Sequence, residues 1–138
     1  MIQYIAWSPL ETFLVTWERH TPSSDGNLIA WKVETGEIVA KLHQKTFVKD
    51  FWPTLQWTAD EALCGYAVSN EVQFYDGKTM NTHVVKYRIK CEGVSALFTA
   101  STASASYRFA VFKPEKKVPC ICVGLGGLEN CGILLLSM

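Results

Sequence analysis

The sequence predicts an all-β fold of short antiparallel strands, and three observations support this. Residues 51–76 contain three apolar or alternating runs that are separated by polar turn residues. The same order of runs occurs fifty residues earlier, in residues 5–42. Most connections between runs are too short for anything but antiparallel neighbours. Four short strands that recur at this period are typical of propeller blades, so we expect a partial β-propeller, WD-repeat-like, with two four-stranded antiparallel blades and an incomplete third.

The first expected blade begins near the N-terminus. Its strands are predicted at Tyr4–Trp7, Phe13–Trp17, Leu28–Val33 and Glu37–Leu42. Pro9 presets φ at the second position of the turn between the first two strands, which suits a type I turn. Ser8 and Glu11 of this turn align with Thr58 and Glu61 of the second repeat.

The second expected blade follows the same plan. Its strands are predicted at Leu55–Trp57, Ala62–Val68, Glu71–Asp76 and Thr82–Tyr87. A third copy begins at Val94–Phe98 and continues at Tyr107–Phe112, and its second half has no recognisable counterpart. We therefore expect two four-stranded sheets packed face to face, with a partial third sheet.

Three tryptophans are the expected core of the blades: Trp7, Trp31 and Trp57. A recognition role is the alternative for each of them. The core interpretation is favoured because burying a large aromatic side chain contributes a few kcal/mol, on the order of 2–3. Trp7 and Trp57 occupy the same repeat position, so we expect them in equivalent buried environments.

Length and composition fit a globular β protein of one domain. The chain has 138 residues and is 49% hydrophobic, 12% aromatic and 19% charged. We place the partial propeller at residues 1–117 and an atypical apolar tail at residues 118–138. The tail is a poor membrane span because it contains Glu129, Asn130 and four glycines, so no membrane partner is expected.

The charges balance, with 13 Lys plus Arg against 13 Asp plus Glu. Any contact with a polyanion therefore requires a local patch. Lys86, Arg88 and Lys90 alternate with Tyr87 and Ile89, which places the three cations on one face of a strand. They form either a charged edge strand that blocks aggregation or a ridge that contacts phosphates.

The five cysteines are an odd set without a regular framework, which indicates a reducing, cytoplasmic compartment. Cys120, Cys122 and Cys131 could form part of a zinc site, but structural zinc sites usually present two paired clusters, so no metal is expected. His20 and His43 lie in polar loops and are expected to be solvated.

The sequence has no phosphate-binding glycine loop, nucleophile elbow or His-carboxylate pair. We therefore expect neither an enzyme nor a cofactor.

Several segments resemble one known family. The propeller of the eukaryotic translation initiation factor 2A family is closely resembled by two segments, Trp57–Cys64 and Asn70–Tyr75. Three shorter segments fit the same family: Leu14–Trp17, Lys32–Gly36 and Phe109–Pro114. The propeller of translation initiation factor 3 subunit b is similar in blade layout and is the nearest competitor. The resemblance covers residues 5–117, and residues 118–138 depart from the family pattern.

The resemblance implies a non-enzymatic translation initiation factor. Its expected partners are the small ribosomal subunit, initiator tRNA or mRNA, and other initiation factors, and Lys86, Arg88 and Lys90 are the candidate RNA-binding residues. The alternative is a propeller that serves only as a protein-interaction scaffold. Steep weakening of binding with salt would favour RNA, whereas salt-insensitive binding to a protein would favour the scaffold.

Overall fold

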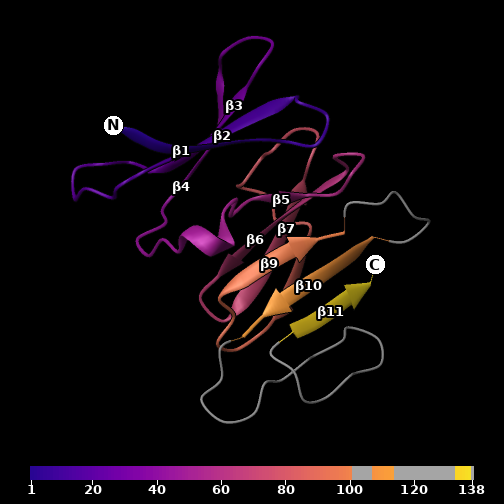
Figure 1. Ribbon diagram of the computed structural model, residues 1–138. Coiled ribbons are helices and arrows are strands. Elements are labelled where there is room, and N and C mark those ends of the chain that lie inside the picture. The colour runs from indigo at the N-terminus through magenta and orange to yellow at the C-terminus, as the bar shows by residue number, and fades with distance from the viewer. Residues whose placement is uncertain (101–106, 114–132, 138) are drawn as a thin grey trace.

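A computed structural model describes residues 1–100, 107–113 and 133–137 of the chain. Their strands form three antiparallel sheets that follow one another in chain order (Figure 1). The first sheet contains β1 (Ile2–Trp7), β2 (Phe13–Glu18), β3 (Leu28–Lys32) and β4 (Ile38–Leu42), in the order β1-β2-β3-β4.

The second sheet repeats this order with β5 (Gln56–Trp57), β6 (Leu63–Val68), β7 (Glu71–Asp76) and β8 (Tyr87–Lys90). The third contains β9 (Ala96–Thr99), β10 (Arg108–Phe112) and β11 (Ile133–Ser137). One 3-10 turn, η1 (Lys49–Phe51), lies in the connection between the first two sheets. The expected all-β fold, with two four-stranded sheets and a smaller third, is confirmed.

Two hydrophobic cores hold the sheets face to face. Between the first and second sheets, the ring of Phe13 stacks on that of Trp57 with centroids 5.7 Å apart and an interplanar angle of 11°. Between the second and third sheets, Phe74 and Phe109 meet at 4.6 Å. Each sheet therefore buries its apolar side chains against the next, as consecutive propeller blades do.

The expectation that Trp7 lies in the core is wrong. Trp7 and Trp57 occupy matching registers, opposite Leu14 and Cys64 respectively, but Trp7 is 56% exposed and Trp57 only 4%. Trp57 packs on the first sheet, whereas no described segment packs on the face that carries Trp7. Trp31 also departs from expectation: it lies on this face half-buried, and its indole N–H donates to the Thr16 hydroxyl at 2.9 Å.

Two strand assignments also change. The fourth strand of the second sheet was predicted at Thr82–Tyr87 and is found at Tyr87–Lys90. Turns after β7 cause the delay: the Met80 N–H donates to the Asp76 carbonyl, and the Val84 N–H to that of Asn81. Ile133–Ser137, which the sequence placed in a separate tail, pairs with β10 as the third strand of the last sheet.

The turns that open the first two sheets have the same geometry. In the first turn the Glu11 N–H donates to the Ser8 carbonyl, and in the second the Glu61 N–H donates to the Thr58 carbonyl, both at 2.9 Å. Glu11 and Glu61 share the left-handed conformation, with φ of 61° and 59°. The sequence repeat is therefore a structural repeat down to backbone hydrogen bonds.

Candidate nucleic-acid interface

The three cations predicted to form a ridge lie on the outermost strand of the second sheet. Arg88 and Lys90 belong to β8, Lys86 immediately precedes it, and all three side chains are exposed. Arg88 pairs with Gln73 of β7, and Lys90 pairs with Glu71. The alternation along β8 places Arg88 and Lys90 on the face that also carries Gln73 and Glu71. Lys86 lies just before the strand, and its backbone N–H donates to the Phe74 carbonyl at 2.8 Å.

A row of hydrogen-bonded polar side chains on β7 supports this surface. The Tyr75 hydroxyl donates to Gln73 Oε1 at 2.6 Å, and Gln73 Nε2 donates to Glu71 Oε1 at 2.5 Å. Tyr75 is buried, and burial raises its pKa while the nearby Arg88 guanidinium partly opposes the shift. Tyr75 thus stays a neutral donor that fixes the Gln73 amide beside Arg88.

The ridge cations have no ion pair within the described ranges, where the recorded ion pairs are Met1 with Glu18 and Lys41 with Asp25. Glu71 lies directly opposite Lys90 and offsets part of the ridge's charge. The arrangement can hold phosphate groups by Coulomb attraction and by hydrogen bonds from Arg88.

The cysteines and histidines in the described part of the chain form no candidate metal site. Cys64 and Cys91 are buried, and burial raises the pKa of the Cys64 thiol well above its usual value. The rings of His20 and His43 meet edge to face at 5.7 Å, with His43 exposed and His20 half-buried. Across residues 1–100, 107–113 and 133–137, no group of three His, Cys, Asp or Glu is placed to hold a metal.

The hypothetical zinc ligands Cys120, Cys122 and Cys131 lie outside the described residues. In the described ranges, no helix has both the length and the apolar character needed to cross a membrane.

Sequence reasoning missed the contacts that join the turns of neighbouring sheets. Glu61 is only 1% exposed, and its Oε1 accepts hydrogen bonds from the Ser8 hydroxyl at 3.2 Å and the Leu10 N–H at 2.9 Å. In the next pair of sheets, the Tyr107 hydroxyl donates to Asp60 Oδ2 at 2.7 Å. The sequence did align Glu11 with Glu61 in the repeated turn, and this alignment was the one feature that could have drawn attention to the contact of Glu61 with Ser8 and Leu10.

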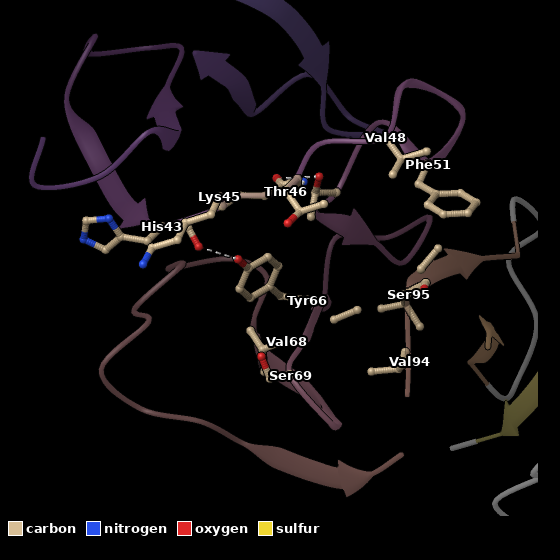
Figure 2. Close-up of a pocket in the computed structure, with 15 residues that line it drawn as sticks. His43, Lys45, Thr46, Val48, Phe51, Tyr66, Val68, Ser69, Val94 and Ser95 are labelled. Atoms are coloured by element: carbon tan, nitrogen blue, oxygen red, sulfur yellow. Dashed lines mark hydrogen bonds between the residues drawn. The ribbon is translucent and has the colours of Figure 1, made fainter. Parts of the chain in front are cut away.

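A hollow of about 660 Å³ opens beside the inner edge of the second sheet (Figure 2). It is bounded by the connection between the first two sheets, by the end of β6, and by the chain entering β9. Its lining residues are His43, Gln44, Lys45, Thr46, Val48, Phe51, Thr54, Tyr66, Ala67, Val68, Ser69, Val94, Ser95, Ala96 and Leu97. The Tyr66 hydroxyl donates to the His43 carbonyl at 3.1 Å across one side of it.

The structure thus defines a segment of three consecutive propeller-type blades with an exposed basic edge. No protein-family model matches the sequence. The chain is similar to eukaryotic translation initiation factor 2A from Dictyostelium discoideum, at 37% identity over 115 residues, and from Schizosaccharomyces pombe, at 36% over 117 residues. These matches cover 81% and 82% of this chain and 19% of each relative.

A third relative, translation initiation factor 2A from Drosophila melanogaster, is 35% identical over 78 residues, which is 53% of this chain and 12% of that protein. A solved structure described as the crystal structure of the eukaryotic initiation factor matches with a TM-score of 0.70 and 33% identity, over 84% of this chain and 28% of that one. The resemblance to translation initiation factor 2A is confirmed. The chain spans about a fifth of the length of the Dictyostelium and Schizosaccharomyces relatives, and less of the Drosophila one.

Proposed function

We propose that the chain acts as a non-catalytic, cytoplasmic segment of a translation initiation factor that contacts RNA of the small ribosomal subunit or initiator tRNA. The observation that carries the proposal is the exposed group formed by Arg88 and Lys90 on the outermost strand β8 and by Lys86 immediately before it. These cations have no ion-pair partner in the described chain. The similarity to relatives named as translation initiation factors gives this basic edge its context.

The mode of binding follows from the chemistry of the ridge. Period-two spacing separates successive cations by roughly 7 Å, close to the spacing of phosphates along an extended single strand. Arg88 can donate two hydrogen bonds to one phosphate, while the lysines act as point charges. Such contacts position a backbone and carry no sequence readout, so binding should be tolerant of RNA sequence.

The test reverses all three charges, Lys86→Glu, Arg88→Glu and Lys90→Glu. The matched control reverses three exposed cations elsewhere, Arg19, Lys49 and Lys78, so both variants have the same net charge. Affinity for labelled initiator tRNA and for small ribosomal subunits is measured across a salt series. The slope of log K against log salt is negative, and loss of three single-strand phosphate contacts should reduce its magnitude by about 2.

A protein-interaction scaffold without RNA binding is the second candidate, and the hollow beside β6 favours it. If the ridge variant and the control bind RNA equally at every salt concentration, the ridge only protects a sheet edge. Salt-insensitive association of the unaltered chain with a protein partner would then support the scaffold.

A further inference from the structure

The hollow beside β6 exists because the innermost strand of the second sheet is short. In the first sheet, β1 has six residues and pairs along β2 as far as Glu18. In the second, β5 has only two residues, which pair with Cys64 and Gly65 of β6. The outer part of β6, from Tyr66 to Val68, therefore has a partner on its β7 side alone.

The hydrogen bonding of β6 identifies which backbone groups are left over. The two-residue turn between β6 and β7 makes Val68 and Glu71 a hydrogen-bonded pair, so alternate residues of β6 direct their N–H and C=O toward β7. Ala67 lies between two such residues, Tyr66 and Val68, so its backbone N–H and C=O point away from β7 and toward the hollow. No backbone hydrogen bond to Ala67 from the opposite side occurs in the described chain.

The first sheet provides an internal comparison for this position. Fifty residues earlier, Trp17 holds the place of Ala67, and Trp17 pairs with Tyr4 of β1. The counterpart of Tyr4 in the second repeat is Thr54, whose hydroxyl instead bonds to Gln44 Oε1 at 2.8 Å. The second sheet thus lacks the piece of strand that fills this place in the first.

The lining of the hollow indicates what could replace it. Val48, Phe51, Val68 and Val94 provide apolar contacts, and none of the fifteen lining residues is acidic. Lys45 is exposed at the rim and has neither a hydrogen-bond nor an ion-pair partner within the described residues (Figure 2). The positive charge of Lys45 therefore favours a ligand that carries an anionic group.

We propose that this hollow binds an extended, acidic peptide segment of a partner protein, which pairs with the backbone of Ala67 as a short additional strand. Strand addition of this kind takes its affinity from main-chain hydrogen bonds and its specificity from alternate side chains. Aliphatic side chains of the peptide enter the hollow, while a carboxylate meets Lys45. This inference is independent of the RNA-binding ridge.

The probe is a fluorescein-labelled peptide that alternates valine and glutamate, compared with one that alternates valine and lysine. The full 138-residue chain is used as a fusion to a soluble carrier, and binding is followed by fluorescence anisotropy. We expect saturable binding of the glutamate peptide alone. Ala67→Pro removes the open N–H without touching the β7 ladder and should weaken binding about tenfold, whereas Ala67→Ser keeps the N–H and should retain it.

Two further measurements keep the test decisive if Ala67→Pro does not fold. Lys45→Glu should abolish the preference for glutamate over lysine, while Lys78→Glu, an exposed position outside the hollow with the same change in net charge, should not. Methylation of the peptide's backbone amides should weaken binding by blocking strand pairing. Equal binding of both peptides, indifference to amide methylation, or no binding at the highest soluble peptide concentration would overturn the proposal.

Discussion

Removing the carboxyl of Glu61 should destabilise the chain, because this side chain fastens the second sheet to the turn of the first. The Glu61→Ala change deletes the bonds to the Ser8 hydroxyl and the Leu10 N–H and leaves the buried hydroxyl without its acceptor. Two net hydrogen bonds at about 1 kcal/mol each, plus the penalty for one unsatisfied buried group, give a loss of about 2 to 4 kcal/mol.

Glu11→Ala is the matched control, because Glu11 occupies the same turn with nearly the same φ and is exposed. Any effect of replacing a glutamate in left-handed backbone is therefore shared by both variants. The exposed position should change the free energy of unfolding by less than about 0.5 kcal/mol. The difference between the two variants isolates the contact between sheets.

Urea unfolding followed by tryptophan fluorescence measures both changes. A shift of 2 to 4 kcal/mol is a large part of the stability of an ordinary domain, about 5 to 15 kcal/mol. Combining Glu61→Ala with Ser8→Ala should show a coupling of about 1 kcal/mol, because the two side chains share a hydrogen bond. Equal losses for Glu61→Ala and Glu11→Ala would refute the role assigned to this contact.

Three other outcomes are expected. Gly77→Ala should cost more than about 2 kcal/mol in urea unfolding, because a Cβ there would lie 2.2 Å from the Glu61 carbonyl oxygen, a backbone atom that cannot easily move. Tyr107→Phe should raise the pKa of Asp60, which is about 2, toward 3.8 in an NMR titration. The depressed pKa stabilises the fold above about pH 3.8, and this contribution is lost as the pH falls through about 2. The variant should therefore be less stable than the parent above about pH 3.8, and the difference should disappear below about pH 2. Cys64 should resist alkylation at pH 8 in the folded chain, because burial keeps its thiol protonated.

The sequence could predict the strands because the evidence for them is local. Alternating apolar residues and short polar turns set β2, β3, β6 and β7 within a residue or two of their observed ends. The start of β8 was misplaced because the turns after Asp76 depend on the backbone conformation of Met80, which has a positive φ that its residue type does not announce. Local pattern is a weak guide where a non-glycine residue adopts left-handed backbone.

The candidate site was only partly predictable for a related reason. Period-two spacing was enough to assign Arg88 and Lys90 to one strand face without a structure, whereas Lys86, predicted near the end of the strand, lies just before it. The role of the ridge in binding RNA stays a prediction. The hollow depends on which residues of the connection fail to pair with β6, and on the contact of Thr54 with Gln44, ten residues apart. Hydrogen bonds that do not form leave no pattern in a sequence.

Trp7 shows why burial cannot be assigned from repeat position alone. Trp7 and Trp57 share a residue type, a register and a following turn, yet Trp7 is 56% exposed and Trp57 only 4%. The difference is that Phe13 of the first sheet stacks on Trp57, while no described residue does the same for Trp7. In a stack of repeats, each interface belongs to two units, so a residue's burial is a property of its neighbour as much as of its own repeat. The exposed Ile5, at 61%, lies two residues from Trp7 on the same strand face and follows from the same cause.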